Sequence, residues 1–267
     1  VYPASPFGTL SHLGPMTRSV ADGALMLTVM AEPDPRDAFS LPYDARDYFS
    51  VLEGGIAGLC VAFSPDLGYA EVDPEVAKLV AAAAKSFAAL GAQVEQVDPG
   101  FDNPQAIFRS HWYAGAAHIL RAMTPEQREL VDPGLRIVAE KGQALDMDAY
   151  MKGAMARSQL VVTMRRFHQK YDLLLTPTMP TPAFSLGPDS PFGQNGEVWD
   201  DWSPFTYPFN LTGQPAATLP CGFTSGGLPV GLQIVGRNYD EVNVLRAAHA
   251  FETAHPEHRK TPSLAAS

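Results

Sequence analysis

The sequence has few of the features that mark secreted or membrane-spanning proteins. Only two cysteines, Cys60 and Cys221, occur among 267 residues, and they lack CxxC spacing. Two cysteines are too few for a disulfide framework, so we expect two buried, reduced thiols in a cytoplasmic protein. The longest apolar stretches, such as 80–84 and 173–175, fall far short of the roughly 20 residues that a membrane span needs. No signal peptide is visible, so no membrane association is expected.

Positive charge is also scarce. The 19 Lys and Arg residues are outnumbered by 29 Asp and Glu residues, which gives a formal net charge of −10. No run of Lys and Arg is longer than a pair such as Arg165 and Arg166. Because phosphate backbones are bound through clusters of basic side chains, direct binding to nucleic acid is not expected.

Motifs for metals, cofactors and self-contained catalysis are missing as well. The seven histidines contain no HExxH or HxxxH spacing, which predicts no metal site. No GxGxxG or GxxxxGK[ST] motif occurs, so no nucleotide or other cofactor is expected, and there is no GxSxG elbow. The six lysines fall on helix faces predicted to be exposed or in the tail, whereas a lysine base must be buried to be neutral. The sequence therefore predicts no complete catalytic group.

What is present is a regular alternation of helix and strand patterns, divided by 24 Pro and 22 Gly. Apolar residues recur at helical spacing over 18–30, with Thr17 or Ser19 as the cap and an expected i,i+4 pair of Arg18 with Asp22. The further expected elements are a strand at 58–65, a helix at 73–91, a strand at 92–97, three or four helices within 103–170, a strand at 171–182, strands at 216–223 and 230–236, and a helix at 240–254. The first strand, helix and strand predict a crossover unit with parallel strands. Residues 184–206 are too irregular for a regular element, and the whole chain, 1–267, is expected to form a single α/β domain.

Three stretches together resemble the amidase signature family in their residues, order and spacing. They are "GTLSHLGPMTRSVADGALML" at 8–27, "GLCVAFSPDLGYAEVDPEV" at 58–76, and "PFNLTGQPAATLPCGFTSGGLPVGLQIVGRNYDEVNVLRAAHAFE" at 208–252. The resemblance implies a serine hydrolase that cleaves carboxamides. It also implies an α/β/α sandwich with a large mixed β-sheet.

The same resemblance implies which chemistry this chain lacks. The family uses a serine nucleophile, a second serine with a cis peptide bond and a neutral lysine base, and backbone N–H groups stabilise the oxyanion. In the family these residues lie in a Gly- and Ser-rich signature that ends shortly before the point matching Val1. We therefore expect the C-terminal half of an amidase, inactive alone, with no catalytic residue of its own. Ser5 and Ser11 are interpreted as loop serines.

The half that is present is expected to contribute to the substrate pocket, because ligand contacts gather on loops at strand ends. Candidate substrate-binding residues are Thr176 and Thr178, at the end of the strand pattern, and Trp202, Phe205 and Asn210 before the third stretch. Gln233, in a strand pattern, is expected to be satisfied by backbone of the missing half.

Two other functions stay open at this point. One is a non-catalytic scaffold or interaction module, and the other is the A-type subunit of an amidotransferase that supplies ammonia for glutaminyl-tRNA formation. The acidic balance and the aromatic residues Trp199 and Trp202 favour a free-standing amidase with a small, apolar amide substrate. Exposed strand edges and an exposed apolar face predict self-association as a homo-oligomer, or flexibility near 1–13.

Overall fold

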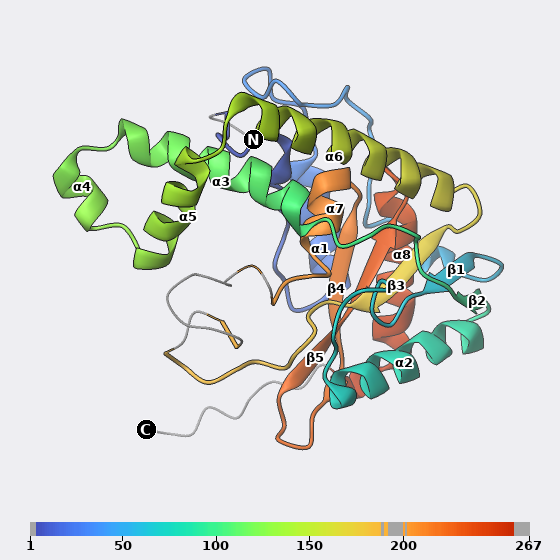
Figure 1. Ribbon diagram of the computed structural model, residues 1–267. Coiled ribbons are helices and arrows are strands. Elements are labelled where there is room, and N and C mark those ends of the chain that lie inside the picture. Colours follow the sequence, from blue (N-terminus) through green and yellow to red (C-terminus); the bar gives the residue numbers. More distant parts are fainter. Residues whose placement is uncertain (1–3, 188–189, 192–199, 201, 259–267) are drawn as a thin grey trace, which may run out of the picture.

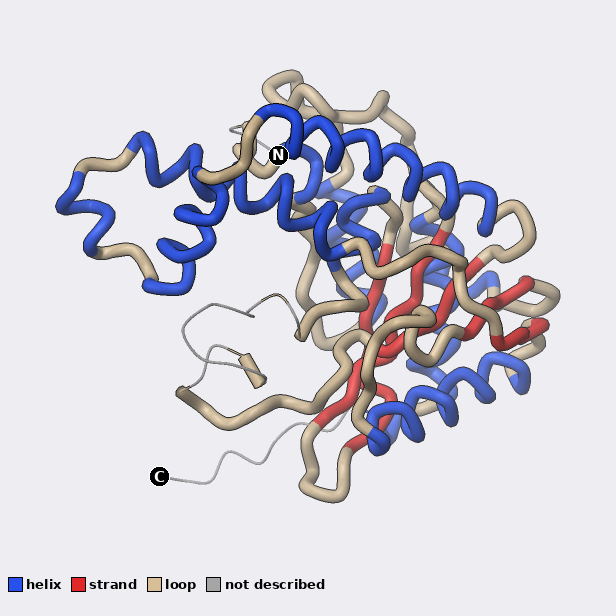
Figure 2. The backbone as a smooth tube through the Cα atoms, in the orientation of Figure 1, coloured by secondary structure: helices blue, strands red, loops and turns tan. Residues whose placement is uncertain are grey.

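A five-stranded mixed sheet lies at the centre of the computed structural model (Figure 1, Figure 2), which describes residues 4–187, 190, 191, 200 and 202–258. The strands are β1 (Cys60–Phe63), β2 (Gln93–Gln96), β3 (Leu173–Pro177), β4 (Ala216–Phe223) and β5 (Pro229–Gly236). Their order in the sheet is β2-β1-β3-β5-β4. β1 runs parallel to β2 and β3, whereas β5 runs antiparallel to β3 and β4. The predicted parallel pairing of the first two strands is therefore confirmed.

Eight α-helices are formed by the described residues. They are α1 (Val20–Met30), α2 (Pro74–Ala89), α3 (Gln105–Ala122), α4 (Pro125–Glu129), α5 (Pro133–Gln143), α6 (Met147–Phe167), α7 (Tyr207–Thr212) and α8 (Glu241–Ala254). Their starts follow from local chemistry. For example, the carboxylate of Asp73 accepts hydrogen bonds from the N–H groups of Glu75 and Val76 at the start of α2. Pro74 has no N–H group, so it leaves no backbone donor unsatisfied in this first turn.

Alternation of side chains along the strands divides the core into two layers. Val61, Leu175 and Ile234 point to one face of the sheet, where they pack with α2 and α8. On that side, Phe87 of α2 and Phe251 of α8 stack with ring centroids 5.7 Å apart. Burial of one such ring contributes about 2 kcal/mol to the free energy of unfolding.

The opposite face of the sheet carries the second layer of the core. Leu174 and Val235 lie on this face and pack with Met164 of α6 and Phe209 of α7. Helices therefore cover both faces of the mixed sheet, which confirms the expected α/β/α sandwich. The middle helices extend from this body. α4 and α5 project from the end of α3 (Figure 1), and Tyr113, Leu120 and Val138 form a separate small core between α3 and α5.

The segment before α1 is fastened to the rest of the chain. Asn210 Nδ2 donates to the backbone oxygen of Leu10 at 2.7 Å, and Arg157 Nη2 donates to the backbone oxygen of Thr9 at 3.3 Å. At the start of α1, the N–H of Val20 donates to both carboxylate oxygens of Glu252 at 3.2 Å. These contacts join the N-terminal segment to α6, α7 and α8.

The predicted helices and strands are all present, although the strand predicted at 171–182 ends at Pro177. Two further details differ. The pattern does not predict α7, a six-residue helix whose Pro208 and Phe209 are buried against the sheet. The expected pair of Arg18 with Asp22 is wrong, because Asp22 Oδ2 accepts from the hydroxyl of Ser19 at 2.6 Å. Ser19 is the cap, as expected, and its oxygen also accepts from the N–H of Asp22.

Within the described part of the chain, no helix combines the length and apolar character that crossing a bilayer requires.

Candidate functional site

A row of polar side chains crosses three strands on the α7-facing side of the sheet. In the register of the sheet, Gln233 on β5 lies opposite Thr176 on β3 and opposite Thr218 on β4. Gln233 Nε2 donates to Thr176 Oγ1 at 2.9 Å and to the backbone oxygen of Phe205 at 2.8 Å. Both donors of this buried amide are thereby satisfied, which a buried polar group requires. The expectation that Gln233 is satisfied by another half is wrong, since the partner backbone belongs to this chain.

Two hydroxyl groups meet farther along the same face. Thr178, just past the end of β3, and Thr218 on β4 have their Oγ1 atoms 2.6 Å apart. Gly231 on β5 leaves the room for this contact. A Cβ atom at Gly231 would lie 2.7 Å from Thr178 Oγ1 and 2.9 Å from Thr218 Oγ1. The hydroxyl groups of Thr178 and Thr218 therefore lie directly over the backbone of Gly231.

We expect Gly231→Ala to lower the free energy of unfolding by about 2 kcal/mol, because the added methyl group must displace both threonine hydroxyls. Urea denaturation at neutral pH measures this loss. Gly14→Ala is the matched control, since a Cβ at Gly14 meets no atom within 4 Å. Equal stabilities of the two variants would contradict the close packing at Gly231.

A pocket of about 220 Å³ lies beside Gly231. Its walls come from the segment after β3, from the chain shortly before α7 and from the start of β5. The lining residues are Met179, Thr181, Pro182, Ala183, Phe184, Trp202, Pro229, Val230 and Gly231. The lining is predominantly aliphatic and aromatic, which is typical of small-molecule sites. The pocket can therefore take an apolar group beside the two threonine hydroxyls.

Trp202 is held at the pocket by a ring contact, and the chain two residues before it is anchored by an ion pair. Its ring meets that of Phe184 edge to face, with centroids 5.6 Å apart. Two residues earlier, Asp200 forms a bidentate ion pair with Arg109 of α3, with Nε to Oδ2 at 2.7 Å and Nη2 to Oδ1 at 2.9 Å. The Asp200 side chain is fully buried. The indole Nε1 of Trp202 is also buried and has no hydrogen-bond partner among the described residues.

The five residues predicted to bind substrate lie in three different places. Thr178 and Trp202 lie at or beside the 220 Å³ pocket. Thr176 and Phe205 are both fully buried, one hydrogen-bonded to Gln233 and the other in the core between the sheet and α6. Asn210 lies on α7 with its amide bound to Leu10. Trp199 lies outside the described residues.

The sequence patterns do not single out the other residues at the pocket. Thr218 and Gly231 could have been found from the register of the predicted hairpin. Arg109 and Asp200 carry no local signal, because 91 residues separate them.

The described lysines and serines do not form a nucleophile–base pair. All five lysines in this part of the chain are exposed. Lys152 and Lys170 pair with carboxylates, those of Asp148 and Glu95. A lysine base must be buried to be neutral, and none of these five lysines is buried. Ser5 and Ser11 bond to each other through their hydroxyls at 3.4 Å, in the N-terminal loop.

The two thiols differ in burial. Cys221 is buried, as expected, and burial raises its pKa to about 12, which makes it a poor nucleophile at neutral pH. The expectation that both thiols are buried is wrong for Cys60, which is only partly buried at the start of β1.

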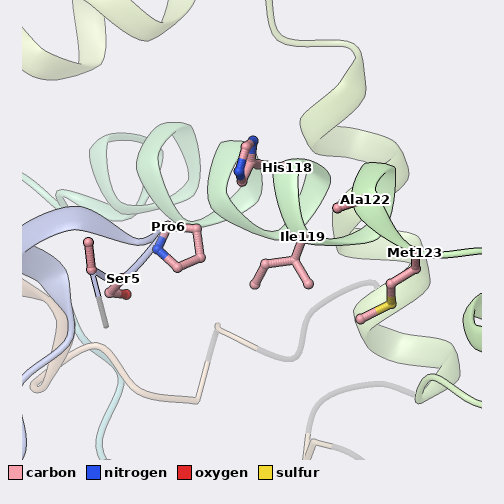
Figure 3. Close-up of a pocket in the computed structure, with 7 residues that line it drawn as sticks. Ser5, Pro6, His118, Ile119, Ala122 and Met123 are labelled. Atoms are coloured by element: carbon pink, nitrogen blue, oxygen red, sulfur yellow. The ribbon is translucent and has the colours of Figure 1, made fainter. Parts of the chain in front are cut away.

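A second, more open groove of about 610 Å³ lies between the N-terminal segment and the end of α3. Ser5, Pro6, His118 and Met123 line it (Figure 3), and His118 and Ile119 project from opposite sides of the helix. The polar groups here do not converge on one point. The smaller pocket at Gly231 is therefore the better candidate site.

Comparison with protein families and sequences places this architecture among known proteins. A family model described as Amidase matches residues 5–245. An acylamidase from Rhodococcus erythropolis is 36% identical over 267 residues, covering 97% of this chain and 56% of that protein. The A-type subunit of a glutamyl-tRNA(Gln) amidotransferase from Myxococcus xanthus is 34% identical over 285 residues, covering 96% of this chain and 57% of that protein. The chain thus spans a little more than half the length of these relatives.

Solved structures share the same fold. A bacterial aryl acylamidase of the amidase signature family superposes with a TM-score of 0.82 at 28% identity, covering 92% of this chain and 54% of that one. A 6-aminohexanoate cyclic dimer hydrolase complexed with substrate superposes with a TM-score of 0.80 at 26% identity, covering 93% of this chain and 56% of that one. The expected mixed-sheet architecture is confirmed by these likenesses.

Proposed function

The chain belongs to the amidase family, and on that premise we propose that it is the C-terminal region of an amide hydrolase that cleaves small carboxamides. In this proposal it builds the wall that holds the apolar group of the substrate. The observation that carries the proposal is the pocket at Gly231, in which Trp202, Phe184 and Val230 surround an apolar space next to two threonine hydroxyls.

The reacting groups belong to polypeptide outside this chain in our proposal. Two facts support this division. The relatives are nearly twice as long as the part that matches, with 56% and 57% of their lengths covered. In addition, the described lysines are exposed, whereas the family chemistry needs a neutral one. This chain's own residues would then bind and orient the substrate and exclude water from it.

The binding role rests on the chemistry of the pocket. An aryl or alkyl group gains about 25 cal/mol for each Å² that it removes from water. Thr178 and Thr218 can donate or accept at the pocket edge, where the polar amide group would lie. The apolar walls would therefore provide affinity for the substrate, and the threonine hydroxyls would orient its amide group.

The proposal predicts that the purified chain does not hydrolyse an acyl anilide, whereas the same chain joined to the preceding segment of its own gene does. Release of the aniline measures both. Turnover by the chain alone, persisting through repeated purification, would overturn its inactivity. Lack of turnover by the longer polypeptide with any carboxamide would instead support a scaffold or interaction module.

A substitution in the longer polypeptide tests the pocket itself. Trp202→Ala should raise KM for the anilide by about tenfold with little change in kcat, since it removes binding shared by ground and transition states. The matched control is Trp112→Phe. Trp112 lies on α3, where it stacks between Phe7 and Phe108, and it is not among the residues that line the pocket. An unchanged KM in Trp202→Ala would contradict the assignment of this pocket.

The amidotransferase alternative stays a second candidate because the Myxococcus xanthus amidotransferase chain is nearly as similar, at 34% identity. The two candidates differ in substrate polarity. Glutamine carries charge at its far end, for which the 220 Å³ pocket offers no ionised side chain in its described lining. Preference for glutamine over an apolar anilide in the longer polypeptide would favour the amidotransferase.

We propose that 1–267 forms one α/β domain, that it acts in the cytoplasm on a small-molecule amide without cofactor, and that it binds no nucleic acid directly. The continuous packing of α2 and α8 on all of β1, β3, β4 and β5 supports a single core. The net charge of −10 argues against a phosphate-binding surface.

Self-association of the isolated chain follows from its exposed apolar side chains. Leu25 and Val29, one turn apart on α1, are 56% and 67% exposed, and Met16 and Phe39 are 97% and 67% exposed. In our proposal these four side chains belong to the face through which two copies associate. We expect the molecular mass to rise with concentration in sedimentation equilibrium.

A pair of lysine substitutions distinguishes this face from other exposed residues. Met16→Lys combined with Val29→Lys should give a monomer at concentrations where the parent chain associates. Leu130→Lys is the control, since Leu130 is 90% exposed just after α4. A parent chain whose mass does not depend on concentration would show that the prediction is wrong.

A further inference from the structure

Three side chains that commonly bind metals meet at the end of α8, where a short 3-10 turn, η3 (Pro256–His258), follows the helix. His255 Nδ1 lies 3.0 Å from Glu257 Oε1, and His258 Nε2 lies 3.7 Å from the same oxygen. One ligand atom from each residue lies within 4.8 Å of the others. The turn explains this meeting, because side chains three residues apart eclipse one another in 3-10 geometry.

The core holds the two imidazole rings in place. They stack on each other with centroids 5.1 Å apart and an angle of 7° between their planes. Both also lie against Phe251, at 4.7 Å for His255 and 5.9 Å for His258. Phe251 itself is only 1% exposed and stacks on Phe87. The rings are therefore held beside Phe251 at the end of α8. Because an imidazole nitrogen binds a metal in the plane of its ring, one ring must rotate out of this stack when both bind the same ion.

Burial and charge at this turn also suit a cation. The side chains of His255 and His258 are 24% and 18% exposed, whereas that of Glu257 is 59% exposed, so the cluster opens to solvent on one side. The Glu257 carboxyl beside two imidazoles supplies one oxygen and two nitrogen ligands.

Distances and ligand type favour one class of metal. Zn²⁺ binds imidazole nitrogen and carboxylate oxygen at about 2.0–2.2 Å, which places neighbouring ligands of a tetrahedron about 3.4 Å apart. The observed 3.0 Å and 3.7 Å lie on either side of this value, and the two histidine ligand atoms lie within 4.8 Å of each other. Mg²⁺ and Ca²⁺ prefer oxygen ligands alone, so two imidazoles disfavour them.

We propose that His255, Glu257 and His258 form a binding site for a borderline divalent cation such as Zn²⁺, with the remaining position open to solvent. The absence of HxxxH and HExxH spacing predicts no metal site, because those spacings bring ligands together on an α-helix. A 3-10 turn brings together a different pair, at positions i and i+3.

The test is titration of the EDTA-treated chain, purified without a histidine tag, with ZnCl₂ by calorimetry. We expect one Zn²⁺ per chain, no displacement by excess Mg²⁺, and a rise in the thermal midpoint when Zn²⁺ is present. His255→Gln and His258→Gln should each weaken binding by at least about tenfold. Visible absorption of the Co²⁺-loaded chain reports the nitrogen and oxygen ligands independently.

The controls keep the outcome unambiguous. His249→Gln should bind Zn²⁺ like the parent chain, since His249 lies earlier on α8 and its Nε2 contacts Glu53. If a histidine variant does not fold, Glu257→Gln still tests the site. The Glu257 side chain is mostly exposed, so its substitution should leave the fold intact, and loss of the carboxylate should weaken Zn²⁺ binding. Absence of stoichiometric binding, or binding unchanged in all three ligand variants, would overturn the proposal.

Discussion

Replacing Arg109 by methionine is expected to lower the free energy of unfolding by about 3 kcal/mol. The guanidinium of Arg109 makes two hydrogen bonds to Asp200, whose side chain has no exposed surface. Without its partner, the carboxylate remains buried and uncompensated, and that desolvation cost is larger than the attraction which is lost. The Arg109 side chain is one third exposed, so the lower end of the range for buried pairs applies. Chemical denaturation of the two proteins measures the difference.

A double substitution separates the ion pair from ordinary packing. Arg109→Met combined with Asp200→Leu should recover much of the loss, because no charge is then left in the interior. Lys152→Met is the matched control. Its pair with Asp148 is 76% and 71% exposed, and exposed pairs contribute at most about 1 kcal/mol. If Arg109→Met and the double variant lose the same free energy of unfolding, packing around Arg109, and not burial of the Asp200 charge, determines the loss.

The same change bears on the proposed function. Asp200 precedes Trp202 in the loop, and Arg109 holds that loop against α3. Release of the loop should displace Trp202 from the pocket and raise KM in the longer polypeptide. The effect on kcat should be smaller, because the reacting groups lie elsewhere in our proposal.

Acidification is expected to destabilise the chain through His168. Burial lowers the pKa of this imidazole to about 4 in the folded protein, whereas an unfolded histidine has a pKa of about 6.5. Between these values the unfolded chain binds a proton that the folded chain does not. The contribution of His168 to stability is therefore complete above the unfolded pKa and is lost as pH falls toward 4. The loss is about 2 kcal/mol between about pH 7 and pH 5.

His168→Gln isolates this contribution from that of the carboxylates. The ring Nδ1 lies 3.0 Å from the backbone oxygen of Tyr171, a contact that the glutamine amide can replace as a donor. Over the same pH interval, the free energy of unfolding of the variant should fall by about 2 kcal/mol less than that of the parent chain. Urea denaturation at both pH values measures the difference. His118→Gln, on the exposed side of α3, serves as the control. Parallel pH profiles for the parent and His168→Gln would contradict the assignment.

Local patterns predict most of the fold because they record burial along one segment at a time. The helix that follows Asp73 can be predicted from its cap, from Pro74 and from apolar spacing, and α2 has these features. α7 escapes prediction, since a six-residue helix is too short for periodicity to show. Its start at Tyr207 is stabilised by tertiary packing of Pro208 and Phe209, which local sequence does not report.

The candidate site is predictable only where it follows the strands. Thr178 lies where the strand pattern ends, and the structure places it on Thr218 because β3, β5 and β4 are neighbours. Phe205 is an aromatic residue in a segment that looks like a loop, but the core encloses it completely. An aromatic side chain in an irregular segment gives the same local signal whether it packs inward or lines a pocket.

The sequence by itself determined the family, the order of helices and strands, and the scarcity of catalytic groups, because periodicity, caps and motif order are properties of neighbouring residues. Only the tertiary structure decided which polar groups meet. It brought Arg109 to Asp200 across 91 residues, Gln233 to Phe205 across 28, and the side chains of His255, Glu257 and His258 together at the end of α8. The reason is physical. A buried polar group needs a partner in space, and the chain's path, not its local composition, determines which partner is near.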